Sequence, residues 1–108
     1  MMNSIILMGR FTKDPEAKKT KSDISYLRAT LAVERDYTQG GERKTDFIPI
    51  VAWRHTAEFI SQYFHKGSMI AVRGTLQIEP WTDEEGNNRS QTQVLVEQAS
   101  FCGETKKE

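Results

Sequence analysis

The segment RHTAEFISQYFHKG, residues 54–67, follows a helical period between stretches that alternate like strands. When it is wound at about 100° per residue, its apolar side chains fall within an arc of roughly 160°. These side chains are Ala57, Phe59, Ile60, Tyr63 and Phe64. Thr56 is expected as the N-cap, and Lys66 with Gly67 is expected to form a basic last turn and a glycine C-cap. The segment therefore predicts an amphipathic helix.

The stretches on both sides of this helix alternate between apolar and polar residues, as half-buried strands do. In the clearest case, residues 24–37, one face carries Leu27, Ala29, Leu31 and Val33, and the other carries Tyr26, Arg28, Thr30 and Ala32. In residues 68–81 a kink is expected at Gly74, and the expected inward residues are Ile70, Val72, Leu76 and Ile78. We predict strands at residues 3–11, 24–37, 46–53, 68–81 and 91–101.

Turn-forming residues separate these strands. Residues 38–45 and 82–90 are polar and contain glycine, which predicts hairpin loops. Residues 13–23 are polar and contain Pro15, so we expect a loop or a weak edge segment there. Pro49 cannot donate a hydrogen bond to a ladder, which places that position of the third strand at an edge or a bulge.

Half-buried strands with one helix between the third and the fourth restrict the fold. Closing the strands into a barrel removes open edges and lets each strand bury one face. We therefore predict an all-β OB-fold, a five-stranded Greek-key β-barrel whose end is plugged by the helix. An SH3-like barrel and an α+β sandwich are alternatives, but neither expects a helix at this place. The OB-fold domain is expected to span residues 1–103, with a short polar end at residues 104–108.

Composition excludes several classes of protein. The 108 residues are enough for one domain with one core. No apolar run approaches the roughly 20 residues that a membrane-spanning helix needs. The first residues show no signal-peptide pattern. The 15 basic and 15 acidic residues cancel, so the net charge itself does not indicate a polyanionic partner.

Residues that could do chemistry are sparse. His55, His65 and Cys102 have no zinc-site spacing, and DEEGNN lacks the acid spacing of a calcium loop. No phosphate-binding glycine loop or nucleophile elbow is present in the sequence. We therefore expect no enzymatic activity, no cofactor and no metal. The single cysteine fits a reducing cytoplasm.

Aromatic residues are expected at loop mouths and on one outer face of the barrel, at Tyr37, Phe47, Trp53 and Trp81. Trp81 stands in PWTDEEGN, residues 80–87, where a solvated turn should follow a strand. Exposed rings in such a group are costly unless a flat partner covers them, and nucleobases stack on aromatic rings at about 1 to 3 kcal/mol each. The alternative is packing, with Trp81 over the barrel rim and with Phe47 and Trp53 in a strand buried on both faces.

Several segments together carry a family resemblance: NSIILMGRFTKDPE, TLAVERDY, DFIPIVAWRHTAEFISQYFHKGS, VRGTLQ and WTDEEGNNRSQTQVLVE. In order and spacing they resemble the bacterial single-stranded DNA-binding protein family, over residues 3–101. The most specific pieces are GRFTKDPE, the helix frame from AE to KGS, and WTDEEG. The resemblance implies sequence-independent binding and protection of single-stranded DNA in replication, recombination and repair. Longer members of the family end in an acidic C-terminal tail. The sequence stops at Glu108 and matches a short form without that tail, either because the protein is naturally short or because the tail has been removed.

The resemblance also implies roles for particular residues. Bases would stack on Tyr37, Phe47, Trp53 and Trp81. Members assemble as homotetramers, as dimers of dimers, and the expected interface residues here are Asn3, Ile5, Leu7 and Ile48. Cations would hold the phosphates, and the candidates are Arg10, Lys13, Arg28, Arg35, Lys44, Arg54, Lys66 and Arg73. The strand that leads to the loop tryptophan departs from many relatives, because it has Gln77 and Glu79 where they carry basic residues.

Two functions remain open from the sequence. The first is the binding of single-stranded DNA by a cytoplasmic, nucleoid-associated protein. The second is an OB-fold accessory protein whose main role is to bind a replication or recombination protein. A titration with poly(dT), followed by tryptophan fluorescence, separates the two functions because only the first predicts strong quenching.

Overall fold

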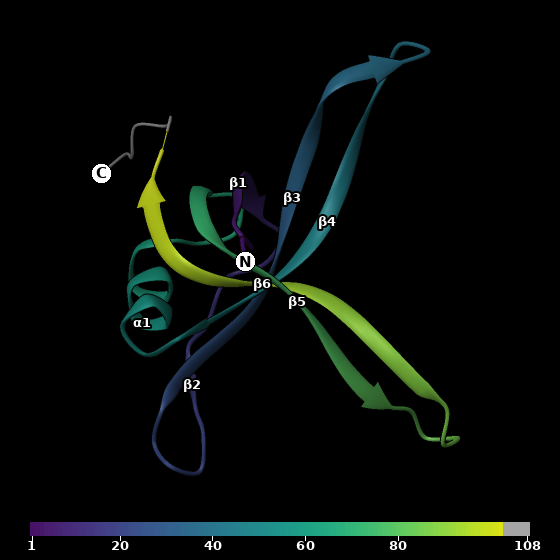
Figure 1. Ribbon diagram of the computed structural model, residues 1–108. Helices are drawn as coiled ribbons and strands as arrows, with labels where there is room; N and C mark the ends of the chain where they lie inside the picture. Colours follow the sequence, from purple (N-terminus) through teal and green to yellow (C-terminus); the bar gives the residue numbers. More distant parts are fainter. Residues whose placement is uncertain (103–108) are drawn as a thin grey trace.

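The computed structural model describes residues 1–102, with side chains for all of these except residues 37–39. Within this part of the chain, six strands and one helix follow one another (Figure 1). They are β1 (Ile5–Phe11), β2 (Lys18–Lys19), β3 (Ser25–Gln39), β4 (Glu42–Trp53), α1 (Arg54–Tyr63), β5 (Met69–Thr82) and β6 (Asn88–Phe101). The short β2 lies in the stretch that was expected to be a loop or a weak edge segment.

The long strands close into a barrel. They pair in the order β1-β5-β6-β4-β3, and β1 also pairs with β3 through Arg10–Ala32 and Phe11–Leu31. Strands β4 and β6 run parallel, and the other pairs are antiparallel. The prediction of a five-stranded OB-fold barrel is confirmed. At Pro49, β4 pairs with β3 but not with β6, so this proline lies at a locally unpaired edge, as predicted.

The core fills the barrel and is closed at one end by the helix. Leu27, Leu31 and Ile50 are fully or almost fully buried, as the alternation of their strands predicts. From α1, Ala57 and Ile60 point into the same cluster. The remaining buried members are Phe11, Ala52, Phe64, Ile70, Val72, Val94 and Val96. No helix in the described residues is both long enough and apolar enough to cross a membrane.

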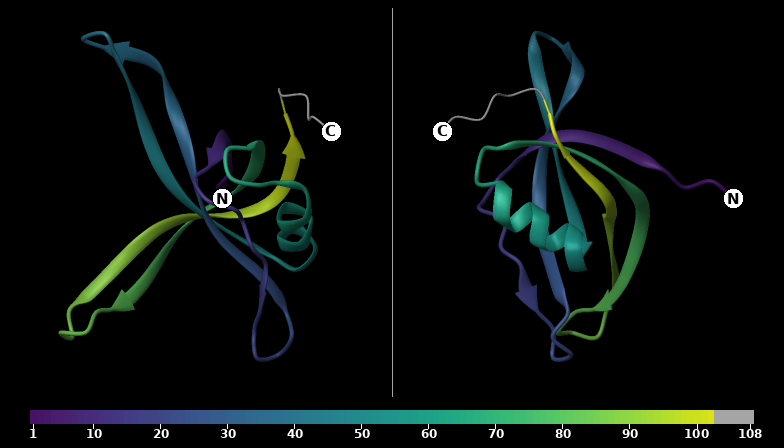
Figure 2. Two further views of the ribbon diagram at one scale, coloured as in Figure 1. Left: turned by 180° about the vertical axis from the view of Figure 1, so that it is seen from behind. Right: turned by 90° about the vertical axis from the view of Figure 1, so that its left-hand side faces the viewer.

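Two antiparallel arms extend beyond this core, and they diverge from the barrel in every view (Figures 1 and 2). One is the outer part of β3 and β4, which turns at Gly40 and Gly41, both with positive φ. The other is the outer part of β5 and β6, which turns at residues 83–87. Both arms are longer, and both loops shorter, than the sequence predicted. Cross-strand bonds continue through residues whose polarity suggested loops, because a two-stranded arm can be solvated on both faces.

The inward positions assigned to the outer half of β5 are wrong. Ile70 and Val72 are buried, but Ile78 is 59% exposed and Leu76 is exposed as well. Both share the face of the core residues by alternation, yet at this point β5 has already left the barrel. At Gly74, where a kink was expected, the ladder with β6 shifts its register, since Arg73 pairs with Gln98 and Gly74 pairs with Val96.

The expected ends of the helix are also wrong. Trp53, not Thr56, occupies the N-cap, and no side chain caps that end. The C-cap is Phe64, so Lys66 and Gly67 lie in the following turn. Gly67 has a φ of 87°, so its conformational freedom serves this turn rather than the helix end.

Candidate nucleic-acid interface

The outward face of the β3–β4 pair presents the two aromatic residues of β4. In the ladder, Trp53 lies opposite Tyr26 and Phe47 lies opposite Ala32. Opposed residues point to the same side of a sheet, so these four share one face. Phe47 is 65% exposed and Trp53 is 43% exposed. Burial in the core, which was the alternative for both rings, is therefore wrong.

Side chains of the two neighbouring strands lie in one row with Trp53. The rings of Tyr26 and Trp53 lie 5.7 Å apart, centroid to centroid, at an angle of 37°. Beyond Tyr26, the ladder places Lys18 of β2. The aromatic surface thus extends across three strands and ends in an exposed cation. The sequence analysis missed Lys18 and Tyr26 as site residues, although Tyr26 belongs to the outward face that the alternation defined.

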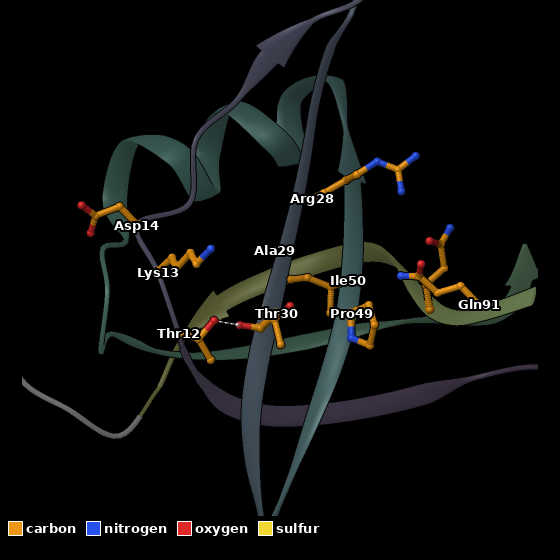
Figure 3. A pocket seen from close by; sticks show the side chains of 10 residues that line it. Thr12, Lys13, Asp14, Arg28, Ala29, Thr30, Pro49, Ile50 and Gln91 are labelled. Carbon is orange, nitrogen blue, oxygen red and sulfur yellow. Dashed lines mark hydrogen bonds between the residues drawn. The ribbon is translucent and has the colours of Figure 1, made fainter. Parts of the chain in front are cut away.

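A polar groove of about 280 Å³ lies next to this aromatic face (Figure 3). Arg28 and Thr30 line it from β3, Pro49 lines it from β4, and Gln91 and Gln93 line it from β6. Residues 12–14 form another wall. The hydroxyl of Thr12 donates a hydrogen bond of 3.3 Å to the Thr30 carbonyl, which fixes this wall against β3.

The face of the β5–β6 arm that carries Trp81 continues into the groove. Trp81 lies opposite Arg89, and two steps along the ladder Glu79 lies opposite Gln91. The next pair on that face is Gln77 with Gln93, whose amide donates to the Gln77 oxygen at 3.5 Å. Since Gln91 and Gln93 line the groove, Trp81, the groove and the β4 aromatics form one surface. Trp81 is 50% exposed on it.

The candidate cations differ in whether an acidic side chain forms an ion pair with them. Arg28 and Lys13 both line the groove, and neither has an ion pair within the described part of the chain. An exposed cation without an acidic partner keeps its full charge for a polyanion. Lys44, Arg54 and Lys66 are exposed and likewise have no ion pair among the described residues. Of these, Lys44 alternates onto the face of β4 opposite to Phe47.

Arg35, another candidate, is already paired with an acidic side chain. Its Nε and Nη2 donate to the two carboxylate oxygens of Asp46 at 3.0 and 3.1 Å. This hydrogen bonding raises the pKa of Arg35 and lowers the pKa of Asp46 from their ordinary values. The pair has no net charge, and it lies on the arm face opposite to Phe47. Arg35 is therefore a weaker phosphate candidate than Arg28.

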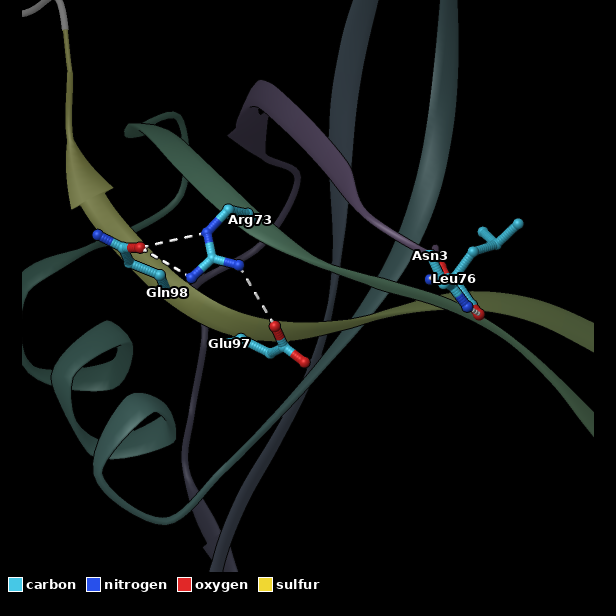
Figure 4. A network of polar contacts seen from close by, with 5 residues as sticks. All are labelled: Asn3, Arg73, Leu76, Glu97 and Gln98. Carbon is cyan, nitrogen blue, oxygen red and sulfur yellow. Dashed lines mark hydrogen bonds and ion pairs between the residues drawn. The ribbon is translucent and has the colours of Figure 1, made fainter. Parts of the chain in front are cut away.

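Arg73 lies on β5, with its side chain turned toward Glu97 and Gln98 of β6 (Figure 4). Its guanidinium donates to Gln98 Oε1 at 3.1 Å and pairs with Glu97 at 3.5 Å. In the β1–β5 ladder Arg73 lies opposite Ile6, away from the groove. Arg73 does not join the aromatic face. Arg10 lies on β1, and its Nη1 donates to the Gly67 carbonyl at 2.9 Å. Arg10 lies opposite Ala32, which is itself opposite Phe47, so it points to the side of the aromatic face at its β1 edge.

The expected interface residues come from the predicted first strand and from β4, and they divide between the barrel and the surface. Asn3 pairs with the backbone of Leu76 through two hydrogen bonds of 2.9 and 3.0 Å (Figure 4). Ile5, Leu7 and Ile48 are partly buried against the core. The exposed apolar residues of β1 are instead Ile6 and Met8, which the sequence analysis did not select.

Two further expectations concern Tyr37 and metal binding. The side chain of Tyr37 lies outside the described part of the chain, so its stacking role stays a prediction. Within the described residues, no group of three or more His, Cys, Asp or Glu side chains is arranged to hold a metal ion.

Comparison with known proteins gives a family match over almost the whole chain. Residues 2–102 match the model of the single-strand binding protein family. A single-stranded DNA-binding protein of Caldanaerobacter subterraneus is 44% identical over 102 residues, which are 94% of this chain and 68% of that protein. Single-stranded DNA-binding protein 2 of Listeria monocytogenes is 41% identical over 94% of this chain and 64% of its own length. Single-stranded DNA-binding protein A of Bacillus subtilis is 40% identical over 94% of this chain and 59% of its own length. The chain thus spans 59 to 68% of the length of these relatives.

Proposed function

Because the chain belongs to the single-strand binding protein family, we propose that it binds single-stranded DNA, without sequence preference, along the surface from Phe47 through the groove to Trp81. The observation that carries the proposal is the position of exposed rings at both ends of a groove lined by Arg28 and Lys13, neither of which has an ion pair among the described residues. Family members of this kind protect single strands during replication, recombination and repair, and we propose the same for this chain.

Stacking supplies the part of binding that does not depend on base sequence. Every base has a flat face, and a ring is worth about 1 to 3 kcal/mol per stacked base. Trp53 and Phe47 are separated by six residues of strand, or about 20 Å at about 3.3 Å per residue. The bases of double-stranded DNA stay stacked on one another, so these rings gain little stacking energy with a duplex.

Phosphate contacts supply the other part of binding. We assign them first to Arg28 and Lys13, because both line the groove and neither has an acidic partner within the described residues. Lys18 extends this path beyond Trp53. Glu79 lies on the path near Trp81, so we expect weaker electrostatic attraction at that end.

The proposed function is tested by titrating the protein with poly(dT) and with a duplex of equal length, using tryptophan fluorescence. We expect strong quenching by the single strand and little response to the duplex. Binding of poly(dA), poly(dC) and poly(dT) at equal salt should differ only modestly, with some preference for pyrimidines, which unstack easily. Equal quenching by duplex, or strict dependence on one sequence motif, would refute the proposal. No response to any nucleic acid would favour the accessory protein that binds a protein partner.

We further propose that the protein is a homotetramer that uses the exposed outer face of β1. Ile6 and Met8 point outward there, and in the neighbouring β5 Met8 lies opposite Ala71 and Ile6 lies opposite Arg73. Adjacent exposed apolar side chains are typical of a covered interface. Light scattering should return a mass near four times 12.4 kDa at micromolar concentration. A monomer mass for the wild-type protein would contradict the tetramer. A tetramer mass that is unchanged in an Ile6→Asp variant would contradict the use of this face.

We also propose residues 1–103 as the DNA-binding domain, and the cytoplasm, at the nucleoid, as its location. Both stay predictions. Limited proteolysis tests the first, because cleavage inside the barrel before the C-terminal end is removed would contradict it.

A further inference from the structure

The β5–β6 arm carries an arginine that the phosphate candidates did not include. Arg89 lies directly opposite Trp81 in the ladder, so both side chains share one face. Its Nε donates a hydrogen bond of 3.0 Å to Oδ2 of Asp83. Within the described residues, Nε is the one guanidinium nitrogen of Arg89 that makes a hydrogen bond. The terminal amino groups therefore remain available as donors.

Asp83 is itself fixed by the loop that it begins. Its Oδ1 accepts the backbone N–H groups of Glu85 at 3.0 Å and of Asn87 at 2.8 Å. The Asp83 backbone N–H donates to the Asn87 carbonyl at 3.0 Å, which closes the loop. The hydrogen bond from the Asn87 backbone, followed by the one from Arg89, lowers the pKa of Asp83 from its ordinary value. A carboxylate held at both oxygens is a rigid partner for an arginine.

The two side chains of this pair differ in exposure. The Asp83 side chain is 17% exposed, whereas the Arg89 side chain is 55% exposed. The carboxylate thus lies against the arm, and the cation stands between it and solvent. This arrangement is suited to a bound anion. An arginine held through Nε still has the N–H groups of its terminal nitrogens for a second acceptor.

We propose that Arg89 binds the phosphate of a nucleotide whose base stacks on Trp81, and that Asp83 is the positioning residue that holds the guanidinium for this contact. The inference rests on the proposed binding of single-stranded DNA. Its physical basis is pre-organisation, since an arginine already held in one orientation loses less side-chain freedom when it binds. Trp81 and Arg89 would then hold the base and the phosphate of the same nucleotide.

The alternative is that the ion pair only fastens the loop. The two explanations predict opposite signs for the removal of the Asp83 charge. An acid near a polyanion repels it, so its loss by charge alone should strengthen binding. If Asp83 positions Arg89, its loss should weaken binding although a negative charge has gone. In Asp83→Asn the side-chain oxygen still accepts the N–H groups of Glu85 and Asn87, which preserves the loop.

The test measures the affinity of full-length variants for a dT oligonucleotide over a range of salt. Glu84→Gln is the matched control, because it removes the same charge from the same loop and Glu84 has no side-chain bond within the described residues. We expect Glu84→Gln to bind slightly more tightly than wild type, and Asp83→Asn to bind about three- to tenfold more weakly. Asp83→Asn that matches Glu84→Gln would overturn the inference.

Two arginine variants complete the cycle. Arg89→Lys keeps the charge and leaves the Asp83 loop bonds intact, but it loses the held guanidinium, so we expect weaker binding with an unchanged salt slope. In an Arg89→Ala background, Asp83→Asn should no longer weaken binding, because no guanidinium remains to be held. If it still weakens binding there, Asp83 acts through the loop and the inference fails. A wild-type protein that does not bind dT at all refutes the proposed function itself, whereas binding with the wrong signs refutes only this step.

Discussion

Arg28 and Arg35 lie on the same strand and carry the same charge, but only the removal of Arg28 should affect binding. Arg28 lines the groove and has no ion pair among the described residues, whereas Arg35 is bonded to Asp46 through two nitrogens. Both changes to alanine lower the net charge equally. We predict that Arg28→Ala weakens binding to single-stranded DNA and lowers its salt dependence, and that Arg35→Ala does neither.

The magnitude follows from one lost phosphate contact at Arg28. For single strands the logarithmic salt slope changes by about 0.7 per contact. Between about 50 and 200 mM salt, a fourfold change, the ratio of wild-type to variant affinity should fall by a factor of about 2.6. A charge-assisted contact of ordinary strength makes Arg28→Ala about tenfold weaker at the lower salt, and therefore about fourfold weaker at the higher salt.

The assay is equilibrium fluorescence anisotropy with a labelled dT oligonucleotide at several salt concentrations. Thermal melting serves as the control, because Arg28 is exposed and its loss should leave the melting temperature unchanged. Equal changes of slope in Arg28→Ala and Arg35→Ala would refute the reasoning, since they would show that net charge matters and the position of the cation does not.

Three more predictions follow from single positions. Trp81→Ala should weaken binding by about 1 to 3 kcal/mol at an unchanged salt slope. The melting temperature should hardly change, because Trp81 is not a member of the core cluster. A sharp fall in melting temperature with intact affinity would show that the ring only packs. Gly74→Ala should destabilise the fold by at least about 2 kcal/mol, because the new Cβ would overlap the backbone carbonyl of Leu95; wild-type thermal stability would contradict this. Because the pKa of Asp83 is lowered in the folded arm, its stabilising effect should be complete above about pH 4 and should be lost as the pH falls through that lowered pKa. Nuclear magnetic resonance of the loop amides from pH 7 to 2 would measure this, and loop opening already at pH 6 would contradict it.

Alternation and period predicted the barrel because burial governs those residues. Leu27 and Leu31 of β3 and Ile60 of α1 were placed correctly from their spacing, and they are fully buried. The same rule failed for Leu76 and Ile78, since alternation tells which face a side chain takes but not where the strand leaves the core.

The candidate site was predicted in part. For Phe47, Trp53 and Trp81 the sequence left exposure and packing as alternatives, and the structure shows all three rings exposed. The sorting of cations did not follow from the sequence, because the pairing of Arg35 with Asp46 depends on the register between two strands. The same holds for Arg89, whose partner Asp83 is set by the geometry of a short loop.

The central claim is that a single strand stacks on the surface that joins Trp53 to Trp81. The chain contains two tryptophans, so the two indole N–H resonances report on the two ends of this surface separately. Titration with an oligothymidylate should shift both resonances with the same apparent dissociation constant, while the methyl group of Met8 on the outer face of β1 stays unchanged. Shifts at Met8 with both indoles unaffected would contradict the account.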